Sequence, residues 1–267
     1  HPDGSIRTVT RRLPEWGNSR WRRIPFMRGV LVLAETMVMG IRALTYSAQI
    51  AAGEEENDEP IPAWTMAITL TASLGLGVGL FFVLPLLITH GVVDRYTEDS
   101  IVSNTAEGVV RLLIFFLYIS LIGLMPSIKR VYAYHAAEHM SVHAHEAGLP
   151  LEPHHIRKFP AAHPRCGTAF LLTVMVVSII VFAFLGMPDL PLRIASRLIL
   201  IPAIAGIAYE VIRFNAMHGE NPLVRAAAWP SLLLQSLTTR PPDDDQIEVA
   251  ITAMVAAVNA DNAASTR

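Results

Sequence analysis

A run of 26 residues, from Trp64 to Thr89, contains no charged side chain. A helix of about 20 mainly apolar residues is long enough to cross the hydrocarbon core of a bilayer. The run therefore predicts a membrane-spanning helix. Pro85 is expected to kink this helix near one end, because proline removes one backbone donor and its ring clashes with the preceding turn.

Further apolar runs predict three more spans. These are Leu112–Ile128, Cys166–Pro188 and Leu190–Ile212, the last of which carries Arg193, Arg197 and Glu210. The two arginines are expected to be paired or to extend toward the membrane surface. Composition agrees with a membrane protein, since 16% of residues are charged against about 25% in soluble domains.

The segment Phe26–Ala51 has apolar residues at helical spacing, but Arg28, Glu35 and Arg42 interrupt it. It is predicted to be an interfacial or bundle-packed helix and not a fifth span. The predicted fold is thus an all-α polytopic membrane protein with about four transmembrane helices. Amphipathic helices near both termini and a cytoplasmic histidine-rich helix complete it.

Basic residues predict the orientation, because loops rich in lysine and arginine stay on the cytoplasmic side. The N-terminal segment and the loop between the second and third spans are rich in arginine and lysine. Both termini and residues 129–165 are therefore expected in the cytoplasm. The expected organisation is an N-terminal segment 1–63, a membrane domain 64–215 containing the histidine-rich loop 129–165, and a C-terminal segment 216–267. The net charge of −2 gives no indication of a nucleic-acid partner.

Both ends of the chain carry local structure signals. Asp3-Gly4 is a hairpin turn signal, and Ile6–Thr10 could form the strand that follows it. The preceding strand is then expected upstream of His1. Near the other end, the sequence from Asp245 to Glu248 has a capping-box pattern. It is followed by an apolar helical stripe formed by Ile247, Ile251, Met254 and Val258.

The motif with the clearest chemistry is His135-x-x-Glu138-His139. Residues four apart lie on one face of a helix, so both imidazoles can reach one ion. In inverzincin peptidases this pattern supplies two zinc ligands and a general base. The sequence therefore predicts a site for zinc or another divalent metal at His135 and His139, with Glu138 as the base.

A catalytic zinc commonly has three protein ligands and one open position. Candidates for the third ligand are Glu146, His163, Cys166 and Glu210. Glu210 could instead pair with an arginine, and Cys166 could be a nucleophile or a small buried residue. Arg165 could bind an anionic substrate or anchor the membrane edge. The remaining histidines of this region are expected to be solvated: His143, His145, His154 and His155.

Several segments together resemble the YqhQ-like family of bacterial membrane proteins. They are Tyr134–His139, Glu146–Gly148, His163–Thr168, Tyr209-Glu210, Leu234–Arg240 and Asp245–Ala250. The resemblance implies a bacterial inner-membrane protein of unknown function, described as a predicted metal-dependent enzyme. Carried over by position, it draws attention to His135, Glu138, His139, Glu146, His163, Arg165, Cys166 and Glu210.

The leading functional hypothesis is a zinc-dependent hydrolase with its site at the cytoplasmic face of the membrane. The alternative is a non-catalytic subunit of a membrane complex, in which the histidine cluster is structural or holds a closed metal site. The expected partner is the lipid bilayer, together with a homo-oligomer or a membrane-complex subunit. Transport is a third hypothesis, but four spans are few for a monomeric carrier.

Overall fold

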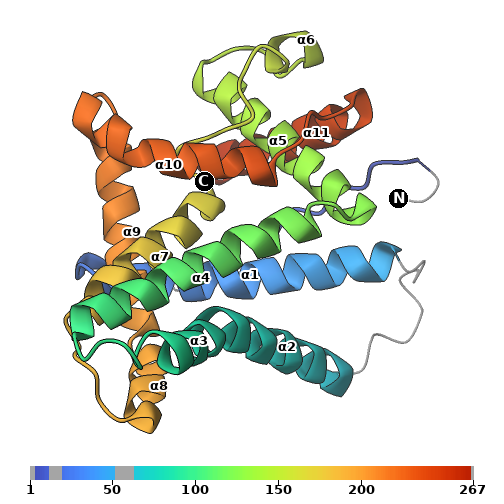
Figure 1. Ribbon diagram of the computed structural model, residues 1–267. Helices are drawn as coiled ribbons and strands as arrows, with labels where there is room; N and C mark the ends of the chain where they lie inside the picture. The colour runs from blue at the N-terminus through green and yellow to red at the C-terminus, as the bar shows by residue number, and fades with distance from the viewer. Residues whose placement is uncertain (1–3, 12–19, 52–62, 266–267) are drawn as a thin grey trace. The chain divides into compact units, whose positions relative to one another are not determined.

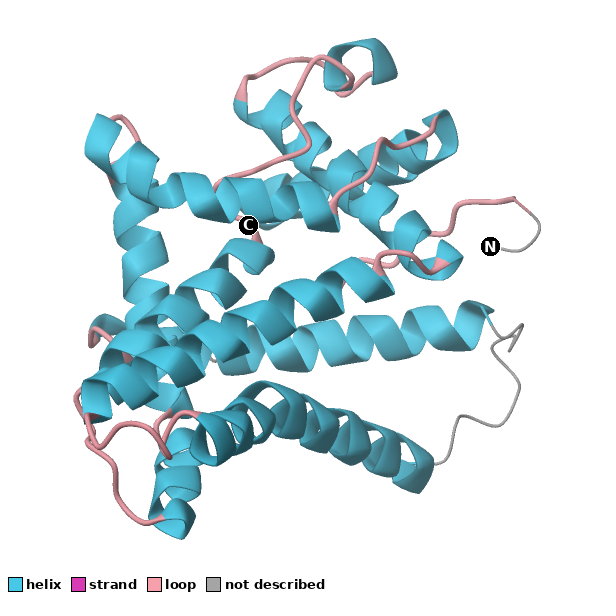
Figure 2. Ribbon diagram, in the orientation of Figure 1, coloured by secondary structure: helices cyan, strands magenta, loops and turns pink. Residues whose placement is uncertain are grey.

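The computed structural model describes residues 4–11, 20–51 and 63–265, and in these ranges it is helical with no strand (Figures 1 and 2). The predicted all-α class is confirmed. The elements are η2 (Arg20–Arg23), α1 (Met27–Ala51), α2 (Ala63–Val78), the π-helical turn η3 (Gly79–Val83), α3 (Leu84–Val92), α4 (Ser100–Ile122), α5 (Pro126–Glu146), α6 (Pro153–Ile156), α7 (Gly167–Ala183), α8 (Leu190–Ile199), α9 (Ile201–Met217), α10 (Pro222–Thr238) and α11 (Asp244–Ser265).

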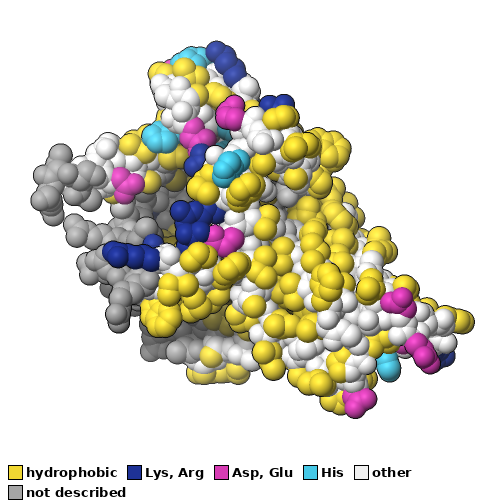
Figure 3. Space-filling view, turned by 90° about the vertical axis from the view of Figure 1, so that its left-hand side faces the viewer, with side chains coloured by type: hydrophobic (Ala, Val, Ile, Leu, Met, Phe, Trp, Pro, Cys, Tyr) yellow, Lys and Arg dark blue, Asp and Glu magenta, His cyan; other side chains and the backbone are white. Residues whose placement is uncertain are grey.

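Three helical stretches in the described part of the chain are long and apolar enough to cross a membrane: Met27–Ile50, Ala67–Val92 and Ser100–Ile122. Helices α8 and α9 bend by 44° at their junction and give a fourth if they form one span. Hydrophobic side chains dominate the face shown in Figure 3. The protein is therefore an all-α polytopic membrane protein whose environment is a lipid bilayer.

The spans differ in detail from those predicted. The second predicted span is displaced, because α4 begins at Ser100 and ends at Ile122. Asp99 sets that start by accepting hydrogen bonds from the N–H groups of Ile101 (2.8 Å) and Val102 (3.2 Å). The third predicted span contains the shorter helix α7, with 17 residues.

Helix α1 is long and apolar enough to be a candidate span, whereas it was predicted to be an interfacial or bundle-packed helix and not a fifth span. Two charges that argued against a span are paired. Arg28 Nε donates to Glu210 at 2.6 Å, and Glu35 forms an ion pair with Arg22. Gly29 lets α1 pack closely on α9, since an added Cβ would lie 2.7 Å from the Cβ of Tyr209.

The chain divides into two compact units: residues 1–4, 15–117 and 173–211 in the first, and residues 5–14, 118–172 and 212–267 in the second. The first unit contains a buried charge network. It comprises Asp94, Glu107, Arg111, Arg193 and Arg197, which lie on or next to α3, α4 and α8. The predicted pairing of Arg193 and Arg197 is thereby confirmed.

The predicted irregularity near Pro85 takes the form of the π-helical turn η3 directly before α3. Pro85 has no N–H to donate to the carbonyl of Phe81, four residues earlier. Arg111 Nε donates to that oxygen instead, at 2.8 Å. A side chain of the charge network thus satisfies a backbone group that the proline leaves without its helical partner.

In the second unit, α5 and α11 lie side by side and also contact the short helix α6 (Figure 1). The core between them consists of Ala137, Met140 and Ala144 from α5, Ile156 from α6 and Ile247 from α11. Four of these five side chains are completely buried. This packing holds one face of α5 in place and leaves another face for the histidines.

Two local predictions at the ends need correction. Residues 5–11 form no strand, because no partner strand is present among the described residues. Gly4 does have the positive φ of +83° that a turn favours, while Asp3 lies outside the described residues. At α11 the capping box is formed by Asp243 and Gln246, which exchange hydrogen bonds of 2.8 and 3.0 Å, two residues before the predicted position.

Candidate metal centre

Helix α5 carries His135, His139 and His143 at intervals of four residues. At about 100° per residue, this spacing keeps all three side chains on one side of the helix. Proline suits the first turn of a helix, and Pro126 begins α5. The helix ends before Gly148, whose φ of +67° favours glycine. The apolar face described above anchors α5, so the histidine face has a defined direction.

Each of these three rings forms a hydrogen bond with a backbone carbonyl. His135 Nδ1 lies 2.9 Å from Thr238 O, His139 Nδ1 lies 2.6 Å from Ala161 O, and His143 Nε2 lies 2.9 Å from Ala162 O. A carbonyl oxygen can only accept, so the ring nitrogen is the donor in every case. In the neutral rings the lone pair is therefore at Nε2 of His135 and His139 and at Nδ1 of His143.

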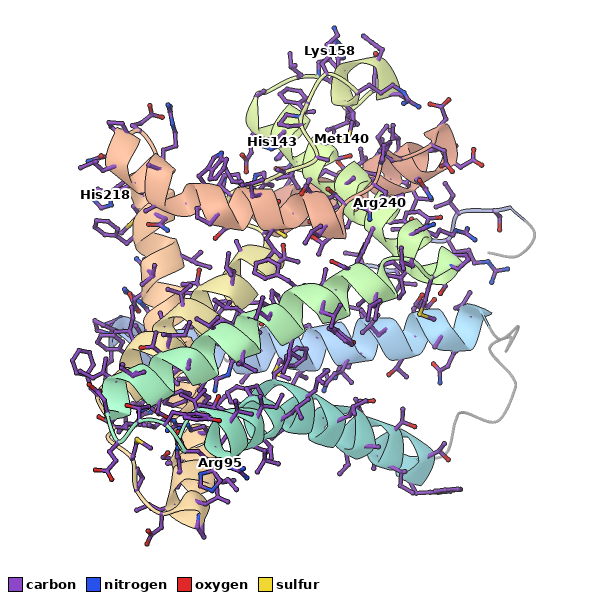
Figure 4. The ribbon with its side chains drawn as sticks, in the orientation of Figure 1. Arg95, Met140, His143, Lys158, His218 and Arg240 are labelled. Carbon is purple, nitrogen blue, oxygen red and sulfur yellow. The ribbon has the colours of Figure 1, made fainter. Side chains whose placement is uncertain are left out.

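One helix and one loop supply these carbonyls. Thr238 is the last residue of α10, and this end of α10 is fixed to α5 because Arg240 N–H donates to Tyr132 O at 3.1 Å. Ala161 and Ala162 belong to the loop that leads into α7. In Figure 4, His143 and Met140 are labelled on α5, and Arg240 marks the end of α10.

Cys166 is the only cysteine of the chain and lies directly before the first residue of α7. Its Sγ is 3.2 Å from His135 Nε2 and 3.1 Å from Thr168 Oγ1. Burial by itself would raise the pKa of Cys166, but hydrogen bonds with His135, His139 and Thr168 outweigh burial and lower that pKa to about 5. The hydrogen bond with Cys166 correspondingly raises the pKa of His135. Both shifts favour the thiolate–imidazolium form of the pair.

His163 lies beside this group and is held through its backbone. Its N–H donates to Gln235 Oε1 at 2.7 Å, and Gln235 Nε2 donates back to His163 O at 2.9 Å. Gln235 is completely buried in α10. Burial lowers the pKa of the His163 ring, although the adjacent Glu146 opposes this shift. His163 is therefore rigidly placed and mainly neutral at pH 7.

Glu146 joins His163 to Arg165. Glu146 Oε2 lies 3.5 Å from His163 Nε2, and Glu146 Oε1 accepts a hydrogen bond from the Arg165 guanidinium. Arg165 N–H also donates to His163 Nδ1 at 3.2 Å. The side chain of Arg165 is 59% exposed, so this ion pair lies at the edge of the group.

These side chains surround an open pocket of about 250 Å³. Its lining consists of His135, Glu138, His139, Val142, Glu146, His163, Arg165, Cys166 and Gly167. Glu138, the predicted base, therefore shares the pocket with the imidazoles and the thiol. The pocket could admit a small polar group together with a metal ion.

Three sets of three donors in the described part of the chain are close enough to hold a cation. One ligand atom from each of His135, His139 and Cys166 lies within 4.8 Å of the other two. The same holds for His143, Glu146 and His163. Two imidazoles and a thiolate are a donor set that suits zinc, so the first set fits the predicted metal. A third set, Glu152 with His154 and His155, is largely exposed on and next to α6.

The structure unites most of the predicted site residues. The His135 and His139 rings lie 4.3 Å apart between centroids, and the His139 and His163 rings 5.8 Å apart. Glu210 is not brought into this group. It pairs with Arg28 and accepts a hydrogen bond from Phe26 N–H at 3.2 Å. The arginine-paired alternative predicted for Glu210 is therefore the one that the structure supports.

Two features of the site were not predicted. His143 was expected to be solvated, but it is only partly exposed and its ring lies 4.5 Å from that of His163. Gln235 and the carbonyl of Thr238 were given no role, because their contribution depends on how α10 packs. The only sequence signal for them was that Leu234–Arg240 belongs to the segments that carry the family resemblance.

Fold and site define an all-α membrane protein with a buried imidazole–thiol cluster. The chain belongs to the family described as Protein of unknown function (DUF1385), which matches residues 24–260. It is 31% identical over 262 residues to "Uncharacterized protein YqhQ" of Bacillus subtilis (strain 168), covering 93% of this chain and 82% of that relative. The predicted resemblance is confirmed. No solved structure matches the chain.

Proposed function

We propose that this protein is a membrane-embedded hydrolase that binds a divalent cation, preferably zinc, through His135, His139 and Cys166. The observation that carries the proposal is the orientation of the two rings. Each donates its Nδ1–H to a backbone carbonyl and keeps Nε2 for the side of the Cys166 thiol. Imidazoles that bind metals usually make this second hydrogen bond, which fixes the tautomer and the ring plane.

The bound metal and two residues of the pocket would each have a defined task. A bound zinc ion would act as a Lewis acid toward a carbonyl or phosphoryl oxygen. Glu138 would accept a proton from the attacking water, since its carboxylate lines the same pocket. Arg165 would contact an anionic oxygen of the substrate, and its exposure allows it to reorient. A peptide, a lipid or a small amphiphile would reach such a site from the membrane surface.

Metal analysis of the purified protein tests the proposal. Wild-type protein loaded with zinc and then desalted is expected to retain bound metal, whereas the double variant His135→Ala, His139→Ala should lose the metal that Cys166 shares. The matched control is His154→Ala, His155→Ala, which removes two neighbouring histidines outside the pocket. Negligible metal in the wild type, or equal metal in both double variants, would contradict the proposal.

The non-catalytic alternative makes a different prediction for the same metal. X-ray absorption would show four protein ligands in a closed structural site, but three protein ligands and an open position in a hydrolase. Hydrolase activity can then be sought with ester and phosphate substrates presented in detergent micelles. A closed site together with copurification of a fixed partner subunit would favour the structural role.

The 3.2 Å contact between Cys166 Sγ and His135 Nε2 supports a second candidate, a cysteine nucleophile activated by histidine. The Thr238 carbonyl would then orient the histidine. Alkylation of Cys166 by iodoacetamide separates the candidates. Zinc bound by the thiolate should protect Cys166 from alkylation, and a chelator should restore reactivity. Reactivity that is indifferent to zinc would favour the nucleophile.

We further propose that the site faces the cytoplasm of a bacterial inner membrane. The connection from α4 to α7 carries Lys129, Arg130, Arg157, Lys158 and Arg165. Basic residues favour the cytoplasmic side. The same rule favours a cytoplasmic location for both termini if α1 does not cross the bilayer. If α1 crosses the bilayer, the N-terminus lies on the opposite side of the membrane. A reporter fused at residue 150 would test the cytoplasmic location of the site, and one fused at residue 267 would test that of the C-terminus. Periplasmic activity at residue 150 would contradict the cytoplasmic site.

A further inference from the structure

The second set of three donors, formed by His143, Glu146 and His163, is adjacent to the first on α5. The His143 and His163 rings have centroids 4.5 Å apart, and the His163 ring lies 5.8 Å from that of His139. His143 and Glu146 are three residues apart and therefore share a helix face. His163 comes from the loop before α7 and is fixed by the buried Gln235.

Two details of this set resemble the first set. His143 donates Nε2–H to Ala162 O, so its Nδ1 lone pair is available to a ligand. Glu146 supplies an anionic oxygen in place of the thiolate. The donors are thus two imidazoles and one carboxylate, which suit zinc, manganese or iron(II). The thiolate of the first set makes that set the softer of the two.

Arg165 holds this second set together in the structure. Its guanidinium pairs with Glu146 Oε1, and its backbone N–H donates to His163 Nδ1 at 3.2 Å. In the neutral ring this places the proton of His163 on Nε2, which faces Glu146 Oε2. A positive group thus lies against Glu146, where a cation would bind. A cation binding through His163 Nε2 would require the neutral ring to change tautomer, with the proton on Nδ1, and this breaks the hydrogen bond from Arg165 N–H.

We propose that His143, Glu146 and His163 form a second cation site. When the cation is absent, the Arg165 guanidinium lies where the cation would bind, beside Glu146. Cation binding then releases this guanidinium into the pocket. The inference rests on the proposed function, because it makes the first site one half of a two-metal centre. Such centres stabilise both the attacking and the leaving oxygen of a displacement. Two dications held by two anionic ligands, with a released guanidinium beside them, favour an anionic substrate such as a phosphate ester.

The Arg165 guanidinium competes with the second cation for the Glu146 carboxylate. Replacing Arg165 with a neutral residue should strengthen binding of the second cation. The ion pair with Glu146 is largely exposed, and exposed pairs contribute little, so the expected gain is only about twofold to fivefold in affinity. Arg165→Gln is therefore expected to bind the second cation more tightly, whereas Glu146→Gln should lose it.

Cation stoichiometry of the full chain in detergent tests the proposal, with cobalt(II) as the metal and elemental analysis for the count. Cobalt bound to thiolate has a charge-transfer absorption that reports the first site alone, because only that site has sulfur. We expect two cobalt ions in the wild type, one in Glu146→Gln with the thiolate absorption retained, and two in the surface control Glu248→Gln, whose side chain is exposed. Arg165→Gln should shift only the weaker, thiolate-independent binding step.

The outcomes separate the two proposals. One cobalt ion per wild-type chain, with thiolate absorption that Glu146→Gln leaves intact, would overturn the second site and leave the first. Two ions in Glu146→Gln, or weaker second-step binding in Arg165→Gln, would also overturn the second site. No bound cobalt in the wild type would overturn both. Gel filtration and thermal unfolding of each variant show that it remains folded, and the thiolate absorption provides an internal check on the pocket.

Discussion

Two groups of buried ionisable side chains in the described part of the chain are organised in opposite ways. In the first unit, Arg111, Arg193 and Arg197 are each at most 2% exposed, and each contacts a carboxylate. Their shortest ion pairs are 2.6 Å to Glu107, 2.6 Å to Asp94 and 2.7 Å to Glu107. In the second unit, His135, His139 and Cys166 each bring one ligand atom to within 4.8 Å of the other two, and Cys166 Sγ lies 3.2 Å from His135 Nε2.

The first group stabilises the fold, whereas the second is suited to binding a ligand. Charges in an apolar environment are tolerated when opposite charges stabilise them, and each arginine of the first group pairs with a carboxylate of the same group. The second group brings together atoms that can all accept, and only a proton or a cation can hold such atoms close. Arginine–carboxylate pairs therefore connect helices here, while the imidazole–thiol group is suited to a ligand.

The largest effect is expected from Glu107→Gln, which removes the carboxylate shared by Arg111 and Arg197. Breaking a buried pair leaves uncompensated charge and costs about 3–5 kcal/mol of the free energy of unfolding. Thermal unfolding in detergent measures it, with the exposed Glu98→Gln as the control expected to change stability by less than about 0.5 kcal/mol. The comparison between the two groups fails if both variants unfold at the same temperature.

Metal removal should affect only the second group. A cation present at about 100 times its dissociation constant stabilises the folded state by about 2.7 kcal/mol, which a chelator removes. Chelation is therefore expected to lower the unfolding temperature of the wild type and of His154→Ala, His155→Ala. The unfolding temperature of His135→Ala, His139→Ala should not respond once Glu146→Gln has also removed the proposed second cation. A chelator response in that variant would show that the ion binds elsewhere.

The pH dependence of Cys166 alkylation in metal-free protein tests the imidazole–thiol contact. Only the thiolate reacts, and the pKa of Cys166 is lowered to about 5, so its reactivity should persist at pH 7 and fall as the pH drops through about 5.

In His135→Ala the pKa should return toward about 8.5, which lowers the rate at pH 7 about 30-fold, equivalent to about 2 kcal/mol. Asn262→Ala, far along the chain on α11, should keep the wild-type profile. Identical profiles for His135→Ala and the wild type would show that the contact does not control the thiol.

The helical part of the site could be predicted from sequence because its information is local. The four-residue spacing of His135 and His139 fixes a shared face whatever the rest of the fold does. The contacts of Cys166 could not be predicted in this way. They depend on the loop before α7 and on the end of α10, which supplies the Thr238 carbonyl. Such contacts arise from tertiary packing and have no sequence period.

The errors in the spans have a related cause. Charged residues were taken as ends of apolar runs, so Glu107 and Arg111 were placed outside the second span. In the structure they lie one turn apart within α4 and form an ion pair of 2.6 Å. Arg28 and Glu35 of α1 are likewise paired, with partners from α9 and η2. A sequence shows that a charge is present, but only the fold shows that it is neutralised.

The smallest effect is expected from Glu210→Gln. This variant tests whether Glu210 acts as the partner of an arginine, like the carboxylates of the first group, or as a metal ligand, like the second group. Its pair with Arg28 is 20% exposed on both sides, so losing the charge should cost about 1 kcal/mol or less. Arg28→Gln should cost a similar amount, and the double variant should cost less than the sum of the two because the interaction is lost only once. Bound metal should be unchanged in all three, because Glu210 neither lines the pocket nor belongs to a set of metal donors. Loss of metal in Glu210→Gln with metal retained in Arg28→Gln would instead make Glu210 a ligand and place it with the second group.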